Sequence, residues 1–460
     1  MSASTSRAAT PPGTRVLSPA LIAIGLGYFM VILDTTIVNV ALPALRADLR
    51  ASVSGLQWVV DSYLLMLAAL LLSGGALADR LGARRVFQLG LGVFVAASVG
   101  CGAAPSTVVL VITRVVQGVG AALAVPASLA LLRAAYPDPG PRARAVGVWG
   151  GIAGIAAAAG PILGGVLVTA ASWRLVFFVN VPIGLAAMVL TTRHVPAPQA
   201  RPRSLDAAAQ LAGVLALAAL TLALIEGGHT GVTPLTISGA AVFVAATAAF
   251  IAIERRVEHP MLPLTLFRDA TFTGGNVVGL LINFGFYGEL FVINLYFQQV
   301  LGYSALVAGL AVLPQMGVVA AASALSGRYT ARAGGPRLTM LIGLVTGGAG
   351  LLGLIVAGVH TPYLLLVGPL VAAGFGMAFT MPAATTAVVE AGPADRAGLA
   401  SGAINAARQV GGVIGVALLG ALVAGGGPIV PGVRIGLAIA GAAFLLGAAV
   451  TMRTIGNRHS

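Results

Sequence analysis

The stretch GALADRLGARR, residues 75–85, begins at the end of an apolar run over residues 54–77. Much later in the chain, GRYTARAGGPR at residues 327–337 follows another apolar run and carries glycines and arginines at matching places. The clearest difference is that Asp79 of the first stretch corresponds to Ala331 of the second. Repeats of this kind are common in membrane transporters. The pair therefore predicts a chain made of two related halves.

The composition supports a membrane protein. Of the 460 residues, 58% are hydrophobic and only 8% are charged, whereas a soluble globular chain carries about 25% charged residues. So few charges cannot cover the surface of a soluble protein of this length, so lipid must solvate much of it. A second repeat, Val125-Pro126-Ala127 against Met381-Pro382-Ala383, falls inside two apolar runs and strengthens the division into halves.

A helix needs about 20 apolar residues to cross a bilayer. The apolar runs that meet this length are residues 18–42, 54–77, 84–103, 108–132, 144–168, 174–193, 206–226, 233–253, 271–299, 304–326, 337–357, 363–389, 398–424 and 432–452. The run at 271–299 is long enough to tilt or break. These fourteen runs predict an all-α polytopic membrane protein with two six-helix bundles and two extra central helices.

The repeat and the runs together give the expected domain organisation. The expected segments are an N-terminal tail (1–17), a first six-helix bundle (18–193), a linker (194–205), two additional helices (206–253), a second linker (254–270), a second six-helix bundle (271–452) and a C-terminal tail (453–460). The two additional helices break the repeat and are expected to lie away from the substrate path. A binding site is expected between the bundles near the bilayer midplane.

Arginine placement predicts the orientation. All 26 basic residues are arginines, and 20 of them fall in loops or tails on one side of the predicted spans. The other side holds Arg46, Arg50, Arg174 and Arg434, while Arg114 and Arg408 lie inside spans. Such a bias predicts that both termini are cytoplasmic. The absence of lysine is typical of a GC-rich bacterial genome, so we expect a bacterial inner-membrane protein.

Several functions are disfavoured by the sequence. Without lysine the chain has neither a Walker A lysine nor a pyridoxal Schiff base, and Cys101 alone cannot form a disulfide or a cysteine metal site. No HExxH or Gly-x-Ser-x-Gly pattern occurs. We therefore expect no enzyme activity, no cofactor and no metal. The arginines lie in short loops rather than in one patch, so nucleic acid is not an expected partner.

Four charged residues inside the predicted spans are candidates for function, because a charge at depth in a bilayer is costly and is usually retained for a role. They are Asp34, Asp61, Arg114 and Glu289. Asp34 is interpreted as a proton carrier or as a structural hydrogen-bond partner. Arg114 either pairs with a buried acid or extends to the outer interface. Asp61 is either an acid near a helix start or a third member of the group.

Glu289 lies in the middle of the long ninth run. It is interpreted either as an acid that faces a cavity and contacts substrate, or as a local cap in a kinked helix. Arg408 lies two to three turns into the thirteenth run and is assigned no role. Trp58, Tyr63 and Trp173 lie at span ends and are interpreted as interfacial anchors.

Four groups of residues resemble the major facilitator superfamily, in its fourteen-span drug/proton antiporter branch. They are residues 33–43, 75–85 and 114–122, and the set Gly147, Gly160, Pro161, Gly164 and Gly165. Residues 172–184 also resemble this branch, whereas Ala156 stands where the antiporter motif has glycine. Residues 224–227 and 272–276 are similar to actinobacterial antibiotic exporters of the methylenomycin-resistance type. The resemblance covers nearly the whole chain.

The resemblance implies roles for these motifs. It implies proton coupling for Asp34 and Arg114, and a gating loop made of Gly75, Asp79, Arg80, Gly82, Arg84 and Arg85. Asp61 is a further candidate for proton coupling on its position alone, because all three residues lie in the outer half of the first bundle. The bland interpretation of that loop is a solvated turn, for which Gly82 is suited. The glycines and proline of the fifth run imply either a kink that prevents leak or close packing alone. The candidates for substrate contact are Glu289, Asn39 and Gln117.

The sequence therefore predicts a proton-coupled antiporter that exports small hydrophobic or cationic compounds such as drugs, antibiotics or secondary metabolites. Its expected partners are the substrate, protons and the lipid bilayer, and the chain is expected to be monomeric. The alternatives are a proton-coupled symporter for uptake, a membrane-embedded enzyme, and a membrane protein without transport activity.

Overall fold

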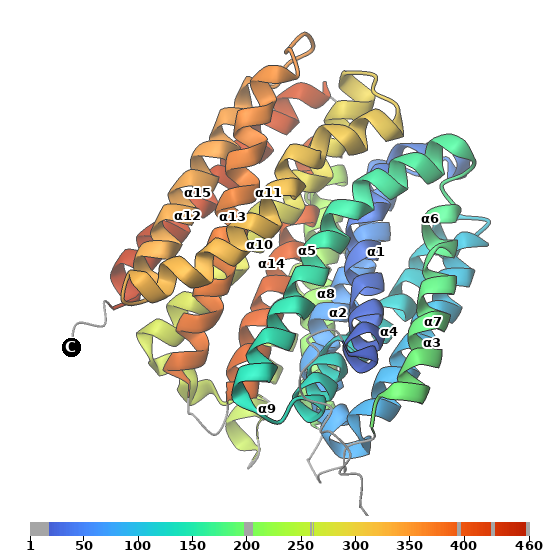
Figure 1. Ribbon diagram of the computed structural model, residues 1–460. Coiled ribbons are helices and arrows are strands. Elements are labelled where there is room, and N and C mark those ends of the chain that lie inside the picture. The colour runs from blue at the N-terminus through green and yellow to red at the C-terminus, as the bar shows by residue number, and fades with distance from the viewer. Residues whose placement is uncertain are drawn as a thin grey trace, which may run out of the picture.

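The computed structural model describes residues 18–196, 206–257, 260, 262–392, 397–424 and 428–456. These residues form helices and no strands, and 14 of the helical segments are long and apolar enough to cross a membrane (Figure 1). The predicted fold class is confirmed. The tail 1–17, most of the linker 194–205 and the last residues of the C-terminal tail lie outside the described residues.

The first half forms six membrane-length segments. Its elements are α1 (Pro19–Leu49), α2 (Val53–Leu81), α3 (Ala83–Gly102), α4 (Thr107–Ala135), α5 (Pro139–Ala170), α6 (Leu175–Phe178) and α7 (Asn180–His194). Three helices begin where a serine side chain accepts a backbone N–H of the first turn, at Ser18, Ser52 and Ser106. The sixth segment is interrupted between α6 and α7, next to Pro182. This break places Asn180 at the start of α7.

The second half repeats this arrangement. Its elements are η1 (Leu264–Arg268), α10 (Ala270–Leu295), η2 (Tyr296–Val300), α11 (Ala305–Arg332), α12 (Pro336–Gly353), η3 (Leu354–Val356), α13 (Leu364–Ala391), α14 (Ala397–Ala424) and α15 (Ile429–Thr454). The long run predicted at 271–299 does not break in its middle. It remains α-helical to Leu295 and closes in the π-helical turn η2.

The two extra helices are α8 (Ala207–Thr230) and α9 (Pro234–Arg256). α9 packs on α8 and is largely exposed, but α8 lies along the seam between the halves, against both α2 and α14. Gln210 of α8 donates a hydrogen bond to the Ala69 carbonyl of α2 over 2.5 Å. Farther along, Gly228 of α8 lies against Ala421 of α14. The peripheral position expected for both helices is therefore found for α9 alone.

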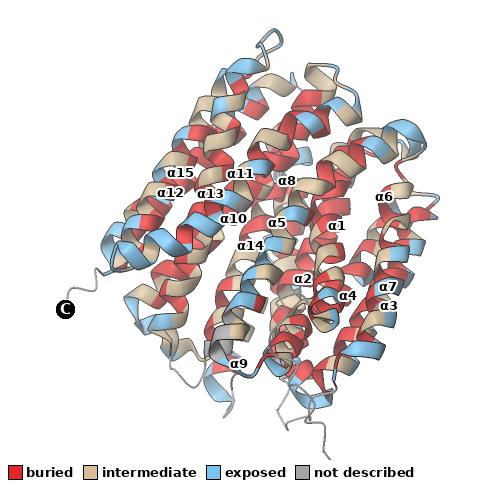
Figure 2. Ribbon diagram, viewed as in Figure 1, coloured by how far each residue is buried: buried red, intermediate tan, exposed pale blue. Residues whose placement is uncertain are grey.

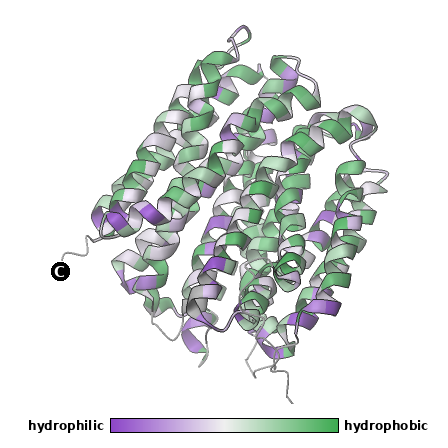
Figure 3. Cartoon of the chain, viewed as in Figure 1, coloured by the Kyte–Doolittle hydropathy of each residue, from purple (hydrophilic) through white to green (hydrophobic). Residues whose placement is uncertain are grey.

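The two ends of the bundle differ. Hydrophilic residues concentrate at the helix ends and apolar residues between them (Figure 3), and we call the end where α1 begins and α15 ends the arginine-rich end. Near the opposite, arginine-poor end, α5 and α11 touch, with Gly165 against Leu306 and Gly309 against Pro161. Towards the arginine-rich end the two helices diverge (Figure 1). The glycines that have open space beside them there are Gly147, Gly150, Gly151, Gly317 and Gly327.

α5 and α11 are thus in contact near the arginine-poor end and farther apart towards the arginine-rich end (Figure 1). The buried residues concentrate on α1, α2 and α10, which lie in the interior (Figure 2). The turns of α5 and α11 near the arginine-rich end are more exposed instead.

Candidate functional site

Three side chains donate hydrogen bonds to Asp34 of α1. It is fully buried and forms an ion pair with Arg114 of α4, which is 1% exposed. Its other carboxylate oxygen accepts hydrogen bonds from Gln117 over 2.9 Å and from Asn180 over 2.8 Å. Three donors from two other transmembrane segments therefore hold one carboxylate. The structure brings together two of the residues that the sequence singled out for proton coupling, Asp34 and Arg114.

Arg114 is held on several sides. Its Nε donates to the Val59 carbonyl of α2 over 2.9 Å, and its Nη1 donates to Gln117 over 2.8 Å. The guanidinium carbon lies 4.2 Å from the centre of the Tyr63 ring, a cation–π geometry. This arginine therefore points into the first bundle and does not extend to the interface. Tyr63 is likewise buried rather than an interfacial anchor, and its hydroxyl donates to the Val31 carbonyl of α1.

Ser98 of α3 completes this group, which we call the Asp34 network. Its hydroxyl accepts a hydrogen bond from Gln117 over 2.8 Å. Asn180, Ser98 and Tyr63 were not among the predicted site residues. Asn180 lies in a stretch that carries the family resemblance, so a signal for it was present. The positions of Ser98 and Tyr63 depend on helix packing, which no local pattern reveals.

Asp61 of α2 is not part of the Asp34 network. It is fully buried, and neither of its oxygens has a hydrogen-bond partner among the described residues. It lies one helical turn from Gln57, whose side chain donates to the carbonyls of Val416 and Ala417 on α14. Residues four apart share a helix face, so Asp61 is on the face of α2 that turns to the second half. Its burial does not fit a solvated acid at a helix start.

Glu289 of α10 is fully buried and accepts a hydrogen bond from Gln315 of α11 over 2.7 Å. Its other oxygen has no hydrogen-bond partner among the described residues. The helix is regular there and the partner is on another helix, so Glu289 is not a local cap. Asn39, a predicted substrate contact, donates to the Thr35 carbonyl of its own helix. The structure thus separates the three candidates: Gln117 lies in the Asp34 network, Asn39 one turn after Thr35 on α1, and Glu289 in the second half.

The antiporter motif of α5 packs against both halves. A Cβ on Gly160 or Gly164 would collide with Thr36 or Ile37 of α1. A Cβ on Gly165 would lie 2.6 Å from the Leu306 Cα of α11. α5 continues as a helix through Pro161. Gly147, in contrast, has open space beside it, so only the part of the motif near the arginine-poor end packs closely in this conformation.

The predicted gating loop lies at the arginine-rich end between α2 and α3. Gly82 has a φ of 92°, which suits glycine at this turn. Arg84 donates to the Thr192 carbonyl of α7 over 2.7 Å, which ties the loop to the sixth segment of its own half. Gly75 lies near Pro126 of α4. Arg80, Arg85 and Asp79 are exposed.

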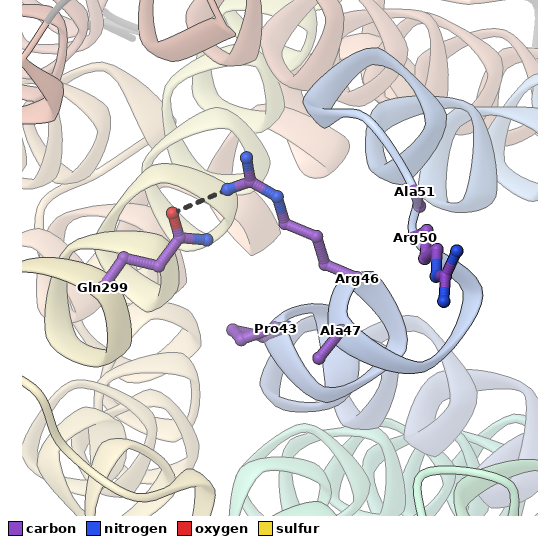
Figure 4. Close-up of a pocket in the computed structure, with 6 residues that line it drawn as sticks. All are labelled: Pro43, Arg46, Ala47, Arg50, Ala51 and Gln299. Atoms are coloured by element: carbon purple, nitrogen blue, oxygen red, sulfur yellow. Dashed lines mark hydrogen bonds between the residues drawn. The ribbon is translucent and has the colours of Figure 1, made fainter.

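A pocket of about 550 Å³ opens near the arginine-poor end of α1 (Figure 4). It is lined by Pro43, Arg46, Ala47, Arg50, Ala51 and Gln299. Arg46 of α1 donates to Gln299 of η2 over 3.0 Å, so one hydrogen bond joins the two halves across this pocket. Nearby, Gln298 donates to the Val40 carbonyl. These contacts help to close the arginine-poor end.

Comparison with known proteins agrees with this architecture. The sequence profile of the Major Facilitator Superfamily matches residues 24–416. The chain is 36% identical to the methylenomycin A resistance protein of Streptomyces coelicolor, over 97% of this chain and 95% of that protein. It is 41% identical to the multidrug resistance protein Stp of Mycobacterium tuberculosis, over 88% and 75% of the two chains. The tetracenomycin C resistance and export protein of Streptomyces glaucescens is 36% identical, over 88% and 76%.

Solved structures share the fold. A bacterial homologue of the human lysosomal transporter Spinster, in an inward-facing and unoccupied conformation, has a TM-score of 0.69 at 18% identity and covers 97% of this chain and 99% of its own. The D-xylose–proton symporter has a TM-score of 0.68 at 16% identity, with coverage of 95% and 98%.

Proposed function

Because this chain belongs to the Major Facilitator Superfamily, we propose that it exports small hydrophobic compounds, including antibiotics, in exchange for protons. The relatives at 35–41% identity are named as resistance or multidrug resistance proteins, which supports export rather than uptake. The observation that carries the proposal is the buried Asp34 network. The close packing of the α5 motif with both halves supports antiport, because it restricts leak when the halves rock.

Proton coupling is assigned to Asp34. A carboxylate inside a bilayer protein is expensive unless it is paired, and Asp34 has Arg114 beside it. In this arrangement Arg114 is the counter-ion of the Asp34 carboxylate. A change in the separation of α1 and α4 would therefore bind or release a proton. Asp61, buried at the seam without a partner among the described residues, is the second candidate.

The arginine-rich end is assigned to the cytoplasm by the positive-inside rule. On this assignment the protein lies in a bacterial inner membrane, both termini are cytoplasmic, and the conformation is open inward. Because both halves of the seam come from one chain, we expect a monomer. Reporter fusions after Arg203, which lies outside the described residues, and after Arg337 should both indicate a cytoplasmic location. A periplasmic signal at either position would rule out this topology.

The sequence also predicts export of cationic compounds, and Glu289 is the residue that we propose contacts them. The residue is fully buried and has one oxygen without a partner among the described residues. That oxygen supports the assignment. The burial means that a cation reaches it only after α10 and α11 rearrange.

Everted membrane vesicles test the export proposal. A proton gradient is established across their membrane, and a panel of dyes and of radiolabelled antibiotics is added to the medium. Wild-type vesicles should accumulate compounds in a gradient-dependent manner, because their cytoplasmic face is outside, and Asp34→Asn vesicles should not. Efflux on acidification, instead of uptake, would support the symporter. Equal accumulation by both proteins would remove the coupling role from Asp34.

A further inference from the structure

One charge inside a membrane-spanning helix has no place in the proposed coupling network. Arg408 lies on α14, the helix of the second half that packs against α2. Its Nη1 donates to Asn405 of its own helix over 3.0 Å, and its Nε is buried with no hydrogen-bond partner among the described residues. No carboxylate within the described ranges forms an ion pair with it. An arginine keeps its positive charge in proteins, so this site holds a cation without a counter-ion.

The side chains around Arg408 come from both halves. Arg408 lies against Gly279 of α10, and Tyr287 of α10 lies against Gly412 of α14, one helical turn after Arg408. The Tyr28 phenol of α1 is within electrostatic range of Arg408. The Tyr28 ring stacks on Trp149 of α5, with centroids 3.8 Å apart and planes 9° from parallel. Tyr287 in turn contacts the Thr35 hydroxyl of α1. The three aromatic residues and Arg408 therefore form one group across the seam.

This group is less buried than its surroundings. Tyr28, Trp149, Tyr287 and Arg408 are all partly exposed, although most neighbouring residues on α1 and α10 are buried. Trp149 lies on the part of α5 where Gly150 and Gly151 have nothing beside them. Its indole N–H, like the Arg408 Nε, has no acceptor among the described residues. Two donors therefore lack an acceptor beside stacked aromatic rings.

We infer that Arg408, Tyr28, Trp149 and Tyr287 form a binding site for hydrophobic organic acids, whose anionic oxygens pair with Arg408 and whose apolar body packs on the aromatic rings. A guanidinium presents several N–H donors in a plane that matches a carboxylate. A charge inside a membrane-spanning segment is costly unless it is paired, and an anionic substrate pairs with Arg408 when it binds. This inference rests on the proposed export function and adds organic acids, bound at Arg408, to its substrates.

Equilibrium binding tests the site without any gradient. The purified full-length protein in lipid nanodiscs is dialysed against radiolabelled 2-naphthoate or against 2-naphthamide, its neutral isostere. The wild type should bind naphthoate at least about tenfold more tightly, since hydrogen bonds to charged groups are worth about that factor or more. Arg408→Gln should lose this preference and bind naphthamide as the wild type does. Arg408→Lys should retain the preference for the anion in weakened form.

Arg434→Gln is the matched control. Arg434 is an exposed arginine of the second half that donates to the Ala357 carbonyl near the other end, so its loss should leave both affinities unchanged. The inference is overturned if the wild type binds the two compounds equally, or if Arg408→Gln keeps the anion preference. If Arg408→Gln does not fold, the aromatic residues supply the test. Tyr287→Leu should bind both compounds more weakly, whereas Tyr287→Phe should bind them as the wild type does, and unchanged binding by Tyr287→Leu overturns the inference. Binding in nanodiscs needs no proton gradient, so the site can stand even where vesicle export fails.

Discussion

The ion pair between Asp34 and Arg114 allows a quantitative test of the Asp34 network. The pair is formed by side chains that are 0% and 1% exposed. Removing one partner of a buried pair costs about 3–5 kcal/mol, because the other charge stays buried without compensation. Asp34→Asn leaves an acceptor for Asn180 but removes the anion beside Arg114. Arg114→Gln should cost a similar amount, because Asp34 then retains only neutral donors.

The double variant should be less damaging than the sum of its parts. With both charges gone, no uncompensated ion remains, and an interaction energy of about 1–3 kcal/mol should appear in the cycle. The assay is thermal unfolding of the purified proteins in one detergent, compared as apparent Tm. Additive losses in the double variant would show that the two residues do not depend on each other, and the account of the network would fail.

Asp48→Asn supplies the control on the same helix. Asp48 pairs with Arg174 over 2.5 Å, but the two side chains are 47% and 35% exposed. Exposed pairs contribute about 0–1 kcal/mol. Its loss should therefore lower the apparent Tm little and leave export unchanged. A loss as large as that of Asp34→Asn would mean that burial does not govern these energies.

Three further predictions concern other parts of the molecule. Glu289→Gln should impair export of cationic dyes and spare neutral ones in the vesicle assay, and equal loss of both would exclude a charge-specific contact. Gly165→Ala should reduce export about tenfold or more, because its Cβ would lie 2.6 Å from the Leu306 Cα, at a packing cost of about 1–3 kcal/mol. Gly147 has open space beside it, so Gly147→Ala should leave export unchanged. Equal effects of the two variants would contradict the packing argument. Arg46→Ala should raise labelling of a Val40→Cys probe by an impermeant maleimide about tenfold, because the Arg46–Gln299 hydrogen bond contributes to closure of the arginine-poor end. Cys101 is buried and should not react. Unchanged labelling would show that this bond does not hold the end closed.

The sequence predicted which residues form membrane helices better than it predicted which helices pack together. Apolar run length sets a membrane helix, so the number and approximate bounds of the spans follow from local composition. The position of α8 does not, because contacts of Gln210 with Ala69 and of Gly228 with Ala421 are between helices distant in sequence. No periodicity in residues 206–253 distinguishes a helix at the seam from one at the periphery.

The residues of the candidate site also differ in how far the sequence could identify them. Asp34 and Arg114 were identifiable because charges inside apolar runs are rare, and their pairing agrees with that rule. Tyr63 was misplaced because an aromatic residue near a span end fits an interfacial anchor equally well. Whether it faces lipid or Arg114 depends on the rotation of α2, which is set by packing with α1 and α4. Arg408 was assigned no role because the sequence alone does not show whether a carboxylate pairs with it. Among the described residues, none does.

The geometry also places a condition on any coupling mechanism. The side chains that bond to Asp34 belong to the first half, so rocking the halves as rigid bodies leaves its separation from Arg114 unchanged. The adjacent residue, Thr35, contacts Tyr287 of α10, and Tyr287 interacts with Arg408. A ligand that pulls on Arg408 and Tyr287 therefore acts on α1 one residue from Asp34. Coupling between two sites requires an element whose two arrangements both sites bias. We propose that this element is α1, and that a shift of α1 relative to α4 links substrate to proton.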